Sequence, residues 1–143
     1  MIKVLMIDGH DRRALACIRS LGRVGGYEIH VGSCRNVNAT KYSKYCSKFF
    51  KYADPEKDIA NFINDVLGYL KENEISVLIP MGENMAYFIN SNIDKLQEYV
   101  SVLQPEKEAF NIARDKEKTL KIAHSIGIPI PYSYTYEQVV ENH

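Results

Sequence analysis

The chain has 143 residues, of which 45% are hydrophobic and 25% charged, enough to bury one globular core. Lysine plus arginine and aspartate plus glutamate each number 18, so the formal net charge is zero and no basic field favours nucleic acid or an anionic membrane. No apolar run approaches the roughly 20 residues that span a bilayer. The composition therefore favours a small molecule or another protein as partner.

The three cysteines do not indicate a metal site or a disulfide framework. The number of cysteines is odd, and the spacing of Cys17, Cys34 and Cys46 does not match that of zinc ligands. Reduced thiols in a cytoplasmic protein are the expected state. The N-terminus has one lysine, a short apolar run and then charged residues, without a small-residue cleavage site, so it predicts a first strand rather than a signal peptide.

The opening of the chain predicts a βαβ unit. Residues 2–7 are almost continuously apolar, which is typical of a central parallel strand covered on both faces. Asp11 is placed to cap a helix whose apolar residues recur at spacings of three and four, and glycines within 22–26 end it. Tyr27, Ile29 and Val31 then alternate with other residues, which predicts a second strand.

Aromatic residues alternate with lysines between residues 36 and 54. Such a pattern is found on surfaces that bind single-stranded nucleic acid, where rings stack on bases and lysines follow the phosphates. It also suits a loop followed by a short strand, residues 47–52, with solvated lysines. Because the chain has no net charge, we favour the loop and strand.

The second half of the chain continues the alternation of helices and strands. Apolar residues within 59–70 lie on one helical stripe, and residues 75–80 form the next apolar run. A turn at 81–84 leads into another helix, and a short strand at 100–103 precedes a short helix at 106–113. This order predicts an α/β fold with a doubly wound, mainly parallel sheet of four or five strands.

Polar residues after the strands indicate where a ligand would bind. In such sheets ligands gather at the carboxyl ends of the strands, here at residues 8–12, 33–35 and 80–84. The first turn has a single glycine, Gly9, where a dinucleotide fingerprint needs three, and the chain has no P-loop motif. The polarity at these ends suits a small polar or carboxylated substrate.

The histidines do not define a catalytic group from sequence. His10, in the first turn, is either a general base or an exposed or capping residue, and the second interpretation is the commoner one for a histidine in a turn. His30 is expected to be partly buried in a strand, and His124 to face solvent on a helix. No Ser/His/Asp or Cys/His grouping can be assembled from sequence order alone.

Two stretches carry a resemblance to a known family. The segment VLIPMGEN (77–84), followed by FNIARDKEKTLKIAHSIGIPIP (110–131), resembles the start of an ATP-grasp enzyme, and most closely the carbamoyl-phosphate-synthase large-subunit-like proteins. The resemblance implies that residues 1–113 form a Rossmann-like pre-ATP-grasp domain. It implies that residues 114–143 are the first helix and linker of a truncated ATP-grasp domain.

Local residues predict both ends of that helix. Asp115 is placed to cap its start, and Gly127, followed by Pro129 and Pro131, is expected to end it and turn the chain extended.

The resemblance also implies an ATP-dependent ligase that uses ATP and magnesium. A carboxylate is phosphorylated, and an amine or another nucleophile captures the acyl phosphate. By position, Lys116 would reach the nucleotide phosphates, and Gly9, Arg12 and Glu83 would lie where relatives bind the non-nucleotide substrate. The resemblance assigns no catalytic residue and no metal ligand to this chain.

The sequence ends before the parts that an ATP-grasp site needs. A second phosphate lysine, a glycine-rich loop, an adenine pocket and acidic magnesium ligands would follow Pro131, so we expect a fragment of a longer enzyme, inactive and without bound nucleotide by itself. The alternative is a free-standing, non-catalytic Rossmann-like module that binds a small ligand or a protein. Under either interpretation, the fragment or the free-standing module, an apolar patch would offer a docking face or support homo-oligomer formation. Its residues are Ile128, Ile130, Tyr132, Tyr134 and Tyr136.

Overall fold

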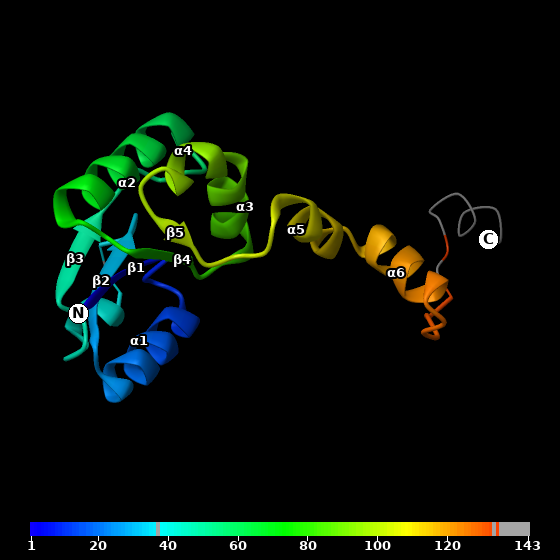
Figure 1. Ribbon diagram of the computed structural model, residues 1–143, viewed down its shortest axis with the longest axis horizontal. Helices are drawn as coiled ribbons and strands as arrows, with labels where there is room; N and C mark the ends of the chain where they lie inside the picture. The colour runs from blue at the N-terminus through cyan, green and yellow to red at the C-terminus, as the bar shows by residue number, and fades with distance from the viewer. Residues whose placement is uncertain (37, 133, 135–143) are drawn as a thin grey trace. The chain divides into compact units, whose positions relative to one another are not determined.

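A computed structural model describes residues 1–36, 38–132 and 134. The chain divides into two compact units, Met1–Gln104 and Pro105–His143 (Figure 1), and each is described by itself. The predicted boundary between residues 113 and 114 concerns two functional domains, and it stays a prediction.

The first unit is built on a five-stranded, all-parallel sheet in the order β3-β2-β1-β4-β5. This confirms the predicted doubly wound α/β class. The chain builds outward from β1 to β3 on one side and then from β4 to β5 on the other, so the topological switch point lies between β1 and β4. The strands are β1 (Ile2–Ile7), β2 (Tyr27–Ser33), β3 (Lys48–Lys51), β4 (Val77–Pro80) and β5 (Ser101–Val102).

The register of the strands aligns four of their carboxyl ends. Ile7 pairs with Gly32 of β2 and with Pro80 of β4, and Ser33 pairs with Lys51 of β3. The loops that follow β1, β2, β3 and β4 therefore leave the sheet at the same edge. A ligand at this edge would meet residues from four separate segments of the sequence.

Helices cover both faces of this sheet (Figure 1). Helix α1 packs through Ile18 on the face that carries Val4 and Met6, while α2, α3 and α4 pack on the face that carries Leu5 and Ile7. β1 supplies both faces because its side chains alternate. The helices of this unit are α1 (Arg12–Val24), the 3-10 turn η1 (Thr40–Tyr42), α2 (Ile59–Asn73), α3 (Glu83–Ser91) and α4 (Ile93–Gln97).

The side chains in this core are fully enclosed. Phe62 of α2, Leu78 of β4 and Leu96 of α4 have no exposed surface. Burying a side chain of this size contributes about 1.5–3 kcal/mol, so the core holds the sheet and its carboxyl edge in place.

The second unit consists of α5 (Lys107–Arg114) and α6 (Lys116–Ser125). The carboxylate of Asp115 accepts hydrogen bonds from the amides of Glu117 and Lys118, which confirms the predicted cap. Gly127 has a φ of 80°, and the amides of Gly127 and Ile128 bond back to the carbonyls of His124 and Ala123. This is a Schellman motif, and it ends α6 where the sequence predicts.

Candidate functional site

A polar pocket of about 450 Å³ opens at the carboxyl edge of the sheet. Its volume is within the range of roughly 300–1,000 Å³ that is typical of small-ligand sites. The loops after β1, β2 and β3 and the first two turns of α3 supply its walls. The residues are Asp8, His10, Cys34, Arg35, Asp54, Pro55, Glu56, Lys57, Asn84, Met85 and Phe88.

Asp8 occupies the first position after β1 and has a left-handed backbone with φ of 68°. Aspartate and asparagine are the non-glycine residues that tolerate this conformation best. The hydroxyl of Tyr52, which is buried, accepts a hydrogen bond of 3.0 Å from the Asp8 amide. A strained backbone held by a buried partner is typical of functional sites.

The carboxylate of Asp8 lies against the start of α3, at Gly82. A Cβ on Gly82 would stand 2.6 Å from Oδ2 of Asp8, so glycine leaves the room that the carboxylate occupies. Burial raises the pKa of Asp8, and the neighbouring His10 ring and Arg35 guanidinium oppose this shift. Asp8 therefore combines restricted solvent access with a place on the pocket wall.

His10 lies beside Asp8 in the pocket wall. Its Nδ1 shares a hydrogen bond of 3.2 Å with Oγ of Ser33 and lies 3.9 Å from Oδ1 of Asp8. Ser33 Oγ also accepts a bond of 3.0 Å from the Arg35 amide. The cap of α1 is Asp11, so the geometry keeps His10 as a possible proton acceptor and removes the capping role.

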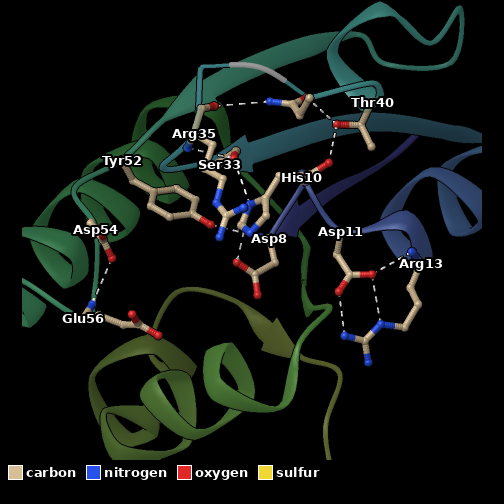
Figure 2. Close-up of polar contacts among 12 residues, drawn as sticks. Asp8, His10, Asp11, Arg13, Ser33, Arg35, Thr40, Tyr52, Asp54 and Glu56 are labelled. Carbon is tan, nitrogen blue, oxygen red and sulfur yellow. Dashed lines mark hydrogen bonds and ion pairs between the residues drawn. The ribbon is translucent and has the colours of Figure 1, made fainter.

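Arg35 follows β2, and Figure 2 shows its side chain extending toward Asp8, between Tyr52 and His10. Its positive charge is near enough to Asp8 to oppose part of the rise that burial causes in the pKa of that carboxyl. Within the described residues, however, the Arg35 guanidinium forms no hydrogen bond or ion pair. A cation is thus presented to the pocket with its donors available.

The loop after β3 completes the wall. Oδ1 of Asp54 accepts a bond of 3.1 Å from the Glu56 amide, and Oδ2 lies 3.8 Å from Nζ of Lys57. Asp54 thus shapes its own turn, and the exposed Glu56 carboxylate adds a negative charge to the pocket rim. The sequence interpretation has a loop and a short strand at 47–52 lying over the core, and it does not assign the residues after that strand to a site. The Asp-Pro-Glu run directly after a short strand is the signal that would have placed it at the same edge.

The residues predicted to bind substrate lie near this pocket but do not line it. Arg12 and Glu83 are the first residues of α1 and α3, and both are exposed. Gly9 is buried, and a Cβ there would stand 2.4 Å from Cγ1 of Val31, so its smallness permits close packing. Their assignment to substrate stays a prediction.

Lys116, predicted to reach nucleotide phosphates, is the exposed first residue of α6 in the second unit. Among the described residues, no group of three or more His, Cys, Asp or Glu could hold a metal ion. The described residues therefore form no magnesium site by themselves. No described helix is long and apolar enough to cross a membrane.

The second unit has a separate hollow of about 680 Å³ beside α6. It includes Ile130 and Tyr132 of the predicted apolar patch. Ile128 and Tyr134 are also exposed, whereas Tyr136 lies outside the described residues. The exposed His124 lines this hollow as well, which agrees with the solvent-facing position predicted for it.

His30 is more deeply placed than the partial burial that the sequence predicts. Its ring is fully buried, with Nε2 2.8 Å from Oε1 of Glu28 and Nδ1 3.0 Å from the hydroxyl of Tyr69. The bond to His30 lowers the pKa of Glu28. Both ring nitrogens are satisfied, so His30 belongs to the packing of the sheet rather than to the pocket.

Solved structures of other proteins contain a similar architecture. An L-amino acid ligase from Bacillus licheniformis superposes with a TM-score of 0.71 at 12% identity, over 95% of this chain and 36% of that one. Glycinamide-RNase-transformylase T from Mycobacterium tuberculosis gives 0.63 at 11%, over 96% and 39%. N5-carboxyaminoimidazole ribonucleotide synthetase from Thermotoga maritima gives 0.63 at 16%, over 99% and 36%.

These structures are ATP-grasp enzymes, and the match is to their N-terminal region. The chain has the fold of the N-terminal domain of ATP-grasp enzymes. It spans 36–39% of the length of the three structures. No protein-family model matches the sequence, and no curated protein matches it.

Proposed function

We propose that this chain is the substrate-side domain of an ATP-dependent ligase that joins a carboxylate to an amine. One observation carries the proposal: the fold of an ATP-grasp N-terminal domain holds a polar pocket at the carboxyl edge of its sheet, bounded by the loop after β1 and the start of α3. This edge, beside the switch point between β1 and β4, is where open α/β sheets bind ligands.

In this function the chain binds and orients the substrate that is not the nucleotide. Asp8 and Arg35 hold charged groups of that substrate, and Tyr52 fixes the backbone that carries Asp8. Holding a reactant in one geometry lowers the activation barrier, because the reactant has already lost translational and rotational entropy on binding. In this function the activation of the carboxylate by ATP belongs to residues outside the pocket.

The nucleotide side of the proposal rests on Lys116 and on the resemblance to carbamoyl-phosphate-synthase large-subunit-like proteins. Lys116 stands at the start of α6, where a cation opposes the helix dipole and a bound phosphate would offset both charges. Magnesium ligands would come from other parts of an ATP-grasp site. ATP and magnesium are therefore proposed cofactors of the whole enzyme.

The test is a measurement of ADP release by the natural full-length protein with Mg-ATP and a panel of carboxylates and amines. We expect ADP release to depend on both one carboxylate and one amine. Saturable binding of a small molecule without any ADP release would overturn the ligase and favour a non-catalytic binding module instead.

A further inference from the structure

The pocket carries charges of both signs around a small volume. Asp8, Asp54 and Glu56 are acidic, and Arg35 and Lys57 are basic. A purely anionic ligand such as a phosphate would face three carboxylates, and a purely cationic one would face two cations. The lining instead matches a ligand that has both an ammonium and a carboxylate group.

The positions of the charges sharpen this match. Arg35 and Asp8 are within electrostatic reach of each other, yet they form no direct ion pair in the described part of the chain. Asp54 is already engaged, by the Glu56 amide and by Lys57. Among the described residues the Asp8 carboxylate has only the His10 ring, 3.9 Å away, as an ion-pair partner, and the exposed Glu56 carboxylate lies at the rim. Arg35 and Asp8 are therefore the two opposite charges that lie near each other and are left for a ligand that bridges them.

Asp8 is suited to an ammonium rather than to a neutral group. Burial raises the pKa of its carboxyl, which means that the ionised form lacks solvation in the unliganded protein. An ammonium ion would supply that missing stabilisation through a charge-assisted hydrogen bond. On the other side, the planar guanidinium of Arg35 matches a carboxylate in two-point geometry.

We propose that the pocket binds a small zwitterion, an α-amino acid, with its ammonium group at Asp8 and its carboxylate at Arg35. This deepens the proposed function, on which it rests for its biological meaning, by naming the substrate class of the same site. The volume of about 450 Å³ suits a small molecule of this kind.

The experiment is calorimetric titration of the full protein, without nucleotide, with each common L-α-amino acid in turn at up to about 10 mM, where a millimolar site is nearly saturated. For any amino acid that binds, the matching amine without the carboxylate and the matching 2-hydroxy acid are titrated as well. We expect at least one amino acid to bind, and both analogues to bind about tenfold more weakly or worse. The proposal is overturned if no amino acid binds, or if the 2-hydroxy acid or inorganic phosphate binds as tightly.

Two variants locate the binding. Arg35→Met should weaken binding of the amino acid at least about tenfold and leave binding of the matching amine unchanged. Arg19→Met, on the exposed surface of α1, is the matched control and should bind like the wild type. Equal affinities of Arg35→Met and wild type for the amino acid would overturn the placement. Because Arg35 is exposed, this variant tests the site even if changes at Asp8 impair folding.

The titration tests the zwitterion site and the ADP assay tests the ligase, so either result can be negative without the other. Amino acid binding without ADP release would leave the zwitterion site standing and overturn the ligase. ADP release that depends on an amine and a carboxylate but needs no amino acid would support the ligase and overturn the zwitterion site.

Discussion

The buried hydroxyl of Tyr52 accepts a hydrogen bond of 3.0 Å from the backbone amide of Asp8. Tyr52 follows β3 and Asp8 follows β1, so the bond spans the carboxyl edge of the sheet across β2. It fixes Asp8 in its left-handed conformation, with the carboxylate on the pocket wall.

Tyr52→Phe should therefore destabilise the fold by about 1–3 kcal/mol, because the Asp8 amide loses its acceptor in a partly buried place. Urea denaturation measures the change, and Tyr42→Phe, at a position that is 80% exposed, should cost nothing measurable. Equal stability of the two variants would show that water replaces the hydroxyl and that the bond does not hold the turn.

Asp8→Asn should stabilise the protein at neutral pH. The raised pKa of Asp8 means that the native state binds its proton more tightly than the unfolded state, so ionisation costs stability as the pH rises from the ordinary value of 3.8 through the raised one. Asparagine keeps the left-handed backbone and does not titrate. Urea denaturation between about pH 3 and about pH 8 measures the free energy of unfolding of both proteins. The difference in favour of the variant should be small at the acid end, grow as the pH rises through the raised pKa of Asp8, and then level off. An advantage that shrinks with rising pH would contradict the buried carboxylate.

Gly9→Ala should destabilise the first unit by about 1–3 kcal/mol, because the new methyl group would meet Val31 and the carbonyl oxygen of Gly32. Gly68→Ala is the matched change in open space within α2, and it should stabilise by up to about 1 kcal/mol through helix propensity. Thermal denaturation of both variants gives the comparison. A neutral Gly9→Ala would mean that β2 can move away, and that Gly9 need not be small.

Tyr69→Phe should cost about 1–3 kcal/mol, because it leaves Nδ1 of the fully buried His30 without its partner. Because His30 lies outside the pocket lining, ligand affinity should not change. Chemical denaturation and ligand titration on the same sample separate the two effects. A loss of affinity with unchanged stability would place His30 in the binding machinery instead.

The sequence predicts the sheet well because its strands are short apolar runs separated by amphipathic helices. The first strand, predicted at 2–7, is β1 as observed, and the helix stripe after Pro55 is α2. Helix α4 is not predicted, since its five residues are too few to show a period. The cap at Asp115 and the stop at Gly127 follow from local residue chemistry alone and are confirmed.

The site is harder to predict because it depends on which strands are neighbours. Sequence order places residues 8–12, 33–35 and 80–84 at strand ends, but it does not show that β3 lies beside β2 and brings Asp54 and Glu56 to the same edge. Nor does it show that Tyr52 reaches Asp8 across β2. Both features depend on tertiary pairing.

A pair of steady-state measurements on the proposed full-length ligase, with and without Arg35→Met, tests the substrate-binding role of this pocket. The KM of the variant for the amino acid should rise at least about tenfold, while its KM for ATP stays unchanged, because the proposed role of Arg35 is to bind substrate and not nucleotide. Arg19→Met should leave both values as in the wild type. An Arg35→Met enzyme whose KM rises for ATP and not for the amino acid would contradict a substrate-side role for this pocket.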